Sequence, residues 1–169
     1  TITYNDKGCY MCLIKNCEAD THWNNRVYNE FILWTRELGL YGKYSHTKFI
    51  PDCIKYGASD DQIRLFINRL WGTDGYISIS PKKGNHTAVK AIGYNTSSGK
   101  LANDLVYLLQ RVGIVSRISY TSLDNTHKNK KRPWIVHRHG SYRIEIYGQY
   151  RHKFLSEIGI YGKEYKYEH

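Results

Sequence analysis

The chain has 169 residues, enough to bury one sizeable core or most of a core that is divided between two units, and this length argues against more than two domains. Its 25 Lys and Arg outnumber its 15 Asp and Glu, which gives a formal net charge of +10, and 16 Tyr and 4 Trp are scattered among them. Basic charge together with aromatic side chains favours a nucleic-acid partner, although net charge alone also fits an ordinary basic protein.

Targeting signals are missing from the sequence. No apolar run is long enough to span a bilayer, and the first residues lack the charged start and apolar core of a signal peptide. We therefore expect an intracellular protein, in the cytoplasm, the nucleoid or an organelle matrix, with no membrane partner.

The first 58 residues predict a strand or hairpin at 1–16, a helix running from an Asn25 cap to Leu38, and a connector at 40–58. Cys9 and Cys12 have the C-x-x-C spacing of zinc sites, but the alternating pattern around them predicts a strand that points the two thiols to opposite faces. Reduced, partly buried thiols are therefore expected here, rather than a zinc site or a disulfide.

An amphipathic helix is predicted at residues 59–73. Ser59 and Gln62 have capping-box spacing, and the apolar residues recur with helical periodicity at Ile63, Phe66, Ile67, Leu70 and Trp71. Asp74 falls at the last turn, where the helix macrodipole already carries about half a negative charge. A carboxylate there is unfavourable unless a cation answers it, and a divalent metal ion would do so.

The remaining sequence predicts two hairpins, each followed by a helix. The first hairpin comprises Tyr76–Ser80 and His86–Tyr94, and Thr96 or Ser97 caps a helix that ends before Gly113. A second hairpin at 114–121 and 133–147 surrounds a polar loop, and a helix at 149–158 closes the unit. The order is αββαββα. Five residues of the middle helix are predicted to face the core: Leu101, Leu105, Leu108, Leu109 and Val112.

The sequence also repeats itself. Residues 37–43 (ELGLYGK) recur as residues 157–163 (EIGIYGK), and residues 8–14 parallel residues 140–146, each an alternating strand after a glycine. We therefore expect residues 1–58 to be the tail of a preceding repeat with its connector, and residues 59–169 to be a complete repeat. A second motif helix would come from another segment, a partner chain or a homodimer mate.

The nonamer at residues 67–75 (INRLWGTDG) resembles the motif of the LAGLIDADG homing endonucleases, particularly the variant in inteins. The segment Lys48-Phe49-Ile50-Pro51 resembles the family's Lys-x-Ile-Pro block, and residues 94–102 and 108–114 resemble its next strand, helix and turn. Arg69 stands where the name motif has Gly at a close helix contact, and Gly72 where it has the first Asp. These departures concern helix packing more than metal binding, because Asp74 and Gly75 are kept.

The resemblance implies an α+β LAGLIDADG fold with a curved antiparallel sheet that binds double-stranded DNA. It implies Mg²⁺ held at Asp74 and Gly75, with a second Asp from the other repeat, and catalytic roles for Asp74, Lys48 and, as the weaker candidate, Lys163. Basic and hydrogen-bonding residues of the two hairpins are the expected DNA contacts. They are Tyr76, Ser78, Ser80, Lys82, Lys83, His86, Lys90, Arg117, Ser119, Lys130, Arg132, His137, His139 and Arg143.

Four functions fit these patterns. The first is a Mg²⁺-dependent, site-specific DNA endonuclease of an intein or intron. The others are a LAGLIDADG protein that binds nucleic acid without cutting, such as a maturase or regulator, a degenerate endonuclease, and a basic structural subunit without a site. Retention of Asp74 favours the first over the degenerate enzyme for this half alone.

Overall fold

The protein, represented by a computed structural model, is described at residues 29–81, 87–123 and 138–167, and for the backbone of four short strands before them. It divides into two compact units, Thr1–Gly42 and Lys43–His169. The boundary thus precedes the one expected after residue 58. Residues 43–58 belong with the second unit because Ile50, which is 1% exposed, is part of its core.

The first unit holds two antiparallel strand pairs and a helix. Strand β1 (Ile2–Tyr4) pairs with β2 (Tyr10–Cys12), which confirms the predicted hairpin, and β3 (His22–Trp23) pairs with β4 (Arg26–Val27). Helix α1 (Glu30–Glu37) begins later than predicted. Residues 26–27 are extended and paired, so Asn29 rather than Asn25 is the N-cap, accepting a hydrogen bond from the Ile32 amide at 2.8 Å.

The second unit contains the predicted αββαββα order, preceded by a short helix. Its elements are α2 (Asp52–Gly57), α3 (Asp60–Asp74), β5 (Gly75–Pro81), β6 (Thr87–Thr96), α4 (Gly99–Arg111), β7 (Ser116–Thr121), β8 (Ser141–Ile146) and α5 (Arg151–Glu157). One-turn 3₁₀ helices, Gly148–Tyr150 and Glu164–Lys166, flank α5. The four strands form one antiparallel sheet in the order β5-β6-β8-β7. No helix in these described ranges is long and apolar enough to cross a membrane.

Three details of this unit differ from the sequence predictions. Helix α2 lies in the predicted connector, where Pro51 is the N-cap and the acidic Asp52 in the first turn favours a helix start. Helix α4 is capped by Ser98 rather than by Thr96 or Ser97, because the Ser98 hydroxyl accepts the Leu101 amide at 3.2 Å. Cys53 is a free, exposed thiol, whereas the other cysteine side chains lie outside the described residues.

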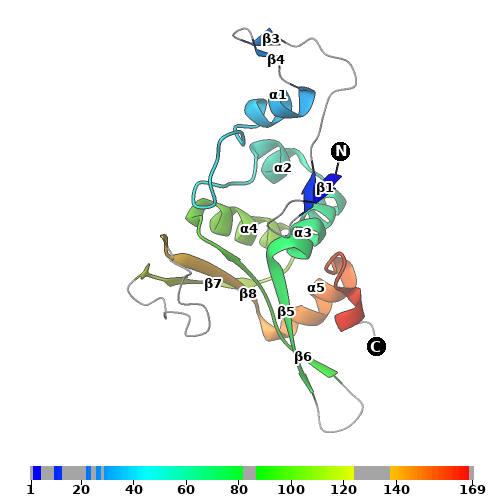
Figure 1. Ribbon diagram of the computed structural model, residues 1–169. Helices are drawn as coiled ribbons and strands as arrows, with labels where there is room; N and C mark the ends of the chain where they lie inside the picture. The colour runs from blue at the N-terminus through cyan, green and yellow to red at the C-terminus, as the bar shows by residue number, and fades with distance from the viewer. Residues whose placement is uncertain are drawn as a thin grey trace. The chain divides into compact units, whose positions relative to one another are not determined.

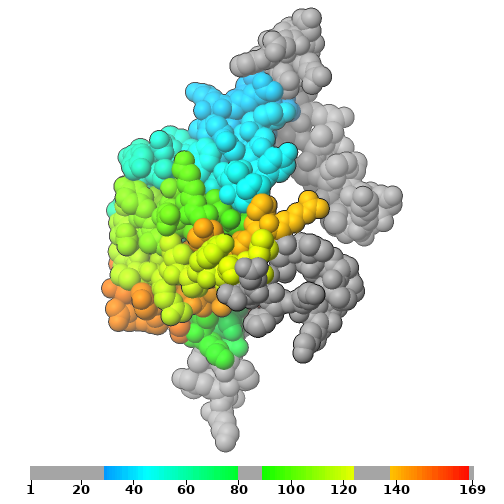
Figure 2. All heavy atoms as spheres, turned by 90° about the vertical axis from the view of Figure 1, so that its left-hand side faces the viewer, coloured from blue at the N-terminus to red at the C-terminus, as the bar shows by residue number. Residues whose placement is uncertain are grey.

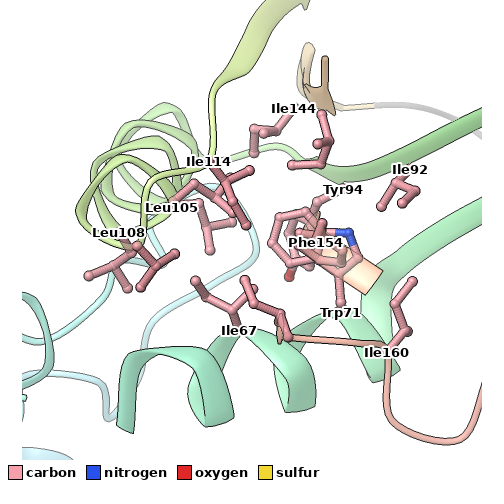
Figure 3. Packing of buried hydrophobic residues seen from close by; sticks show 14 of the residues in the cluster. Ile67, Trp71, Ile92, Tyr94, Leu105, Leu108, Ile114, Ile144, Phe154 and Ile160 are labelled. Carbon is pink, nitrogen blue, oxygen red and sulfur yellow. The ribbon is translucent and has the colours of Figure 1, made fainter. Parts of the chain in front are cut away.

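The core lies between one face of the sheet and helices α3, α4 and α5 (Figure 1). All five predicted core residues of α4 are buried, and Ile63, Ile67 and Trp71 of α3 are fully enclosed. Phe66 and Leu70 are only partly buried, because they flank this stripe rather than point along it. The Trp71 ring meets Tyr94 of β6 and Phe154 of α5, with ring centroids 5.2 and 5.3 Å away (Figure 3).

Helix α3 passes into strand β5 without a loop (Figure 1). The predicted capping box is present at its start, where the Ser59 hydroxyl accepts the Gln62 amide at 3.3 Å and the Gln62 side chain accepts the Ser59 amide at 2.9 Å. At the junction, Gly75 has extended backbone angles that any residue can adopt. Glycine is needed there for space, because a Cβ at Gly75 would lie 2.4 Å from the Trp71 ring.

We therefore expect Gly75→Ala to lower the free energy of unfolding by about 1–3 kcal/mol, because the indole or the strand must move to admit the methyl group. Chemical denaturation measures this change. Gly57→Ala is the matched control, because a Cβ at Gly57 meets nothing within 4 Å. Equal stability of the two variants would contradict the steric role of Gly75.

Candidate active site and nucleic-acid interface

Asp74 is an exposed carboxylate at the C-terminal end of α3. The Tyr94 hydroxyl donates a hydrogen bond to its Oδ2 oxygen at 3.3 Å, and the Tyr94 side chain is 2% exposed beneath it. Burial, and then the negative charge of Asp74, raise the pKa of Tyr94 above its ordinary value of 10. The phenol therefore stays protonated and keeps the carboxylate oriented.

A polar pocket of about 290 Å³ joins Asp74 to the segment before α2. Lys48 lines this pocket together with Asp74, so the structure brings two of the three predicted catalytic residues to one place. Its other walls come from Ser45 and from the end of β6 and the start of α4, namely Tyr94, Asn95, Thr96, Ser97 and Leu101. An acid and an amine facing a solvent-open pocket are the residue types that phosphodiester hydrolysis uses.

Lys48 is held in place through its backbone. The Ser98 hydroxyl, which caps α4, also donates to the Lys48 carbonyl at 2.6 Å. Ser98 is 1% exposed, so this contact is shielded from water. One buried hydroxyl thus fixes both the start of α4 and the position of the lysine at the pocket.

A second set of contacts holds the segment that follows Lys48. The Ile50 amide donates to Asp104 Oδ2 of α4 at 2.9 Å, and the buried Lys55 amine lies 2.8 Å from Asp52 and 3.4 Å from Asp104. The hydrogen bond that Lys55 donates to Asp52 outweighs desolvation and raises the pKa of Lys55. Arg111 donates to the Lys55 carbonyl at 2.6 Å. Residues 48–58 are therefore fastened to α4 along their length.

The side chain of Lys163, from the turn after α5, contacts the C-terminal end of α3. Its amine donates to the Gly75 carbonyl at 2.6 Å and to the Trp71 carbonyl at 3.2 Å. Desolvation lowers the pKa of Lys163, while the charge of Asp74 opposes that shift. Lys163 therefore supplies a cation to the helix end, a role that the sequence analysis assigned only to a metal ion. Its predicted catalytic role stays a prediction.

These contacts bear on where a metal ion fits. Asp74 suits Mg²⁺, which is bound in proteins by one or two carboxylates together with waters and substrate phosphates. The Gly75 carbonyl is less suitable, because an ammonium group already points at its oxygen. Among the residues that the structure describes there is no cluster of three acidic, His or Cys side chains.

The outer face of the sheet, away from the core, gathers five of the predicted DNA contacts. The register places Tyr76 of β5 and Arg143 of β8 on the same face as Arg117 and Ser119 of β7, and the alternation of β5 places Ser78 there too. Ile77, Ile92 and Ile144 point to the opposite, buried face. The alternation inferred from sequence is confirmed for these positions.

The other predicted contacts are less uniform. Lys90 is exposed on β6, and the ring of His139 stacks on that of His46 with centroids 4.0 Å apart. The rest lie outside the described side chains: Ser80, Lys82, Lys83, His86, Lys130, Arg132 and His137.

Sequence reasoning missed an acidic residue at the middle of this face. Glu145 of β8 accepts a hydrogen bond from Arg117 at 2.7 Å and one from the Tyr76 hydroxyl at 3.4 Å. The Arg117 hydrogen bond lowers the pKa of Glu145. The cross-strand pairing of residues 117 and 145 creates this contact. Only a correct strand register could have predicted it.

Comparison with known proteins gives a family and several relatives. The LAGLIDADG-like domain model matches residues 61–159. The replicative DNA helicase DnaB of Nostoc sp. is 30% identical over 150 residues, which is 88% of this chain and 15% of that protein. The DnaB proteins of Synechocystis sp. and Rhodothermus marinus are 28% identical over 80% of the chain and 38% identical over 50%. The chain spans only 9–15% of the length of these relatives.

Removal of the Lys163 amine should destabilise the end of α3. We expect Lys163→Met to lower the free energy of unfolding by about 1–2 kcal/mol, because two carbonyls lose a charged donor and Asp74 loses a nearby cation. Lys166→Met is the control, since it removes a charge from the same turn and relieves repulsion of Lys163. Urea denaturation would contradict the capping role if both variants unfolded at the wild-type midpoint.

Proposed function

The chain belongs to the LAGLIDADG-like domain family, and on that premise we propose that it forms half of a site-specific endonuclease for double-stranded DNA. The observation that carries the proposal is the shared pocket of Asp74 and Lys48. These residues come from separate segments of the chain, and buried contacts hold both segments in place. The basic outer face of the sheet next to this pocket supports DNA as the substrate.

We further propose that the enzyme is encoded by an intein. The relatives are named as replicative helicases, yet the matched stretch is a small fraction of each. A segment of that size that carries a LAGLIDADG-like domain fits an endonuclease inserted in a helicase host. The helicase activity of the relatives is not part of this proposal.

Each group in the pocket has a distinct role in the proposed reaction. Asp74 would hold Mg²⁺, which supplies Lewis-acid stabilisation of the charge that develops on the phosphate. Lys48 would place its ammonium beside the phosphate oxygens and stabilise the same charge. Tyr94, as a neutral donor, keeps one carboxylate oxygen engaged and leaves the other free.

A second repeat is proposed as the partner of this one. At the same spacing of 120 residues, Leu40 of the first copy corresponds to Ile160 of the second, and Trp34 and Phe154 correspond three residues before each copy. Phe154 and Ile160 are fully buried against the motif-helix core. In contrast, Trp34 is 54% exposed, and α1 has no buried residue. The exposed face of α1 therefore fits a helix whose own core belongs to another repeat.

The face of α3 turned away from the core also supports this partner. An apolar groove of about 530 Å³ lies between α2 and α3, and Leu65, Phe66 and Arg69 line its α3 side. The Arg69 guanidinium stacks on the Tyr161 ring, 3.8 Å from its centroid. This stacking places the charge of Arg69 against an aromatic ring, so a second motif helix can approach despite the missing glycine.

We expect Leu65→Arg to prevent association with a second repeat, because it puts a charge into an apolar helix contact. Leu65 is 56% exposed, so the free energy of unfolding of this chain alone should change by no more than about 0.5 kcal/mol. Sedimentation of the chain with and without a partner repeat measures the effect. Val115→Arg, at another exposed apolar position, should leave association intact, and equal behaviour of the two variants would contradict this interface.

The catalytic proposal is tested by Asp74→Asn in the assembled protein. Cleavage with Mg²⁺ should be abolished while DNA affinity stays within about threefold, because the shape of the side chain is kept and its charge is lost. The free energy of unfolding should be unchanged or up to about 1 kcal/mol higher, since an anion leaves a helix C-terminus. Cleavage and unfolding are measured on the same preparation.

The alternative roles of Asp74 give different results in this experiment. A structural carboxylate would lose stability in Asp74→Asn, and cleavage would fall only in proportion. Asp104→Asn is the reference for a structural carboxylate, because Asp104 contacts Lys55 and the Ile50 amide and does not line the pocket. Undiminished cleavage by Asp74→Asn would end the assignment. An assembled wild-type protein that binds DNA without cutting would favour the maturase or regulator function.

A further inference from the structure

A second cavity, of about 290 Å³, opens at the sheet on the side of β6 and β8. Three basic side chains line it, Lys90 from β6, Arg117 from β7 and Arg151 from the start of α5. In the space-filling view the yellow residues of β7 border the orange residues of α5 (Figure 2). Three elements far apart in the sequence therefore bring positive charge to one hollow.

Arg151 has hydrogen-bond donors that its contacts with the described residues do not satisfy. One terminal nitrogen, Nη1, donates to the Val89 carbonyl at 3.4 Å, and this contact ties α5 to β6. The Nε atom is buried and has no hydrogen-bond partner among the described residues. Arg151 lines the cavity, and the Val89 contact uses only one of its two terminal nitrogens, so the other is suited to an anion that arrives there.

Glu145 is the single acidic residue among those that line the cavity, and it is already engaged. Its carboxylate accepts the hydrogen bond from Arg117 at 2.7 Å, and both residues line the cavity. Lys90 and Arg151 form no such ion pair with a residue that lines the cavity. The residues that line the cavity therefore carry a net positive charge.

We propose that this cavity is a binding site for one phosphate group of the DNA backbone, with Arg151 and Lys90 as its ligands and Glu145 as a positioning residue for Arg117. The site rests on the proposed DNA function and adds to it a fixed backbone contact. Ala91, Arg117 and Glu145 belong to the strands of the outer face, so a duplex on that face reaches the cavity. In DNA-binding proteins, contacts of arginine and lysine with phosphates usually fix the position of the protein on the duplex.

The first experiment measures how the affinity for a random-sequence duplex depends on salt. Each phosphate contact contributes about −0.9 to the slope of log K against log salt concentration. We expect Arg151→Gln to make the slope shallower by about one and binding roughly tenfold weaker at low salt. Lys153→Gln is the matched control. It removes the same charge two residues along the same helix, where Lys153 donates to the Gly113 carbonyl.

The outcomes separate this site from the DNA function itself. If the wild-type protein binds duplex DNA with no dependence on salt, or does not bind it, the proposed function fails. If the wild type behaves as expected but Arg151→Gln and Lys153→Gln share its slope, the phosphate site is overturned and the function stands. Thermal unfolding of both variants shows whether the fold is retained.

A second measurement does not require Arg151→Gln to fold. The NMR signal of the Arg151 Nε–H group, assigned with Arg151→Lys, should shift when duplex DNA is added to the wild-type protein. Sodium phosphate at matched ionic strength is the parallel arm. A signal that moves with phosphate but not with DNA would assign the cavity to a free phosphate ion and overturn the DNA site. A signal that moves with neither would overturn both.

Discussion

The contact between the Lys163 amine and the last carbonyls of α3 is the interaction on which the candidate active site depends. Helix α3 ends with the acidic Asp74 and has no basic residue in its last turn, so its own sequence adds negative charge where the dipole is already negative. Lys163 brings the missing cation from the turn after α5. Gly159 and Gly162 shape that turn, with φ of 69° and 74°, values that favour glycine.

The same turn links the chemistry to the repeat. Gly39 and Gly42 of the first copy have φ of 68° and 73°, so the two copies share a backbone conformation as well as a sequence. In the second copy the turn ends at a lysine that caps a motif helix. The first copy also ends at a lysine, Lys43. A repeat partner would thus receive the same cap on its own motif helix, and each acidic residue would have its own cation.

The sequence predicted what depends on local pattern. The capping box, the apolar stripe of α3, the αββαββα order and the polar face of the hairpins follow from spacing alone, and the family motif located Asp74 and Lys48. The α4 cap was misplaced because three adjacent hydroxyl residues fit the pattern equally, and only the Lys48 carbonyl, fifty residues away, selects Ser98. The cap by Lys163 and the pairing of Arg117 with Glu145 were also missed, because both arise from tertiary contacts.

Strand β6 connects the two polar hollows of the second unit. Its C-terminal end, at Asn95 and Thr96, lines the pocket of Asp74, and Lys90 near its other end lines the basic cavity. Lys90 and Thr96 are six residues apart, so about 20 Å of strand separates the two hollows. A phosphate held at the basic cavity would therefore restrict which phosphate lies at the carboxylate. The placement of a cut would then depend on a backbone contact as well as on base recognition, because a slip by one step would put the wrong bond at Asp74.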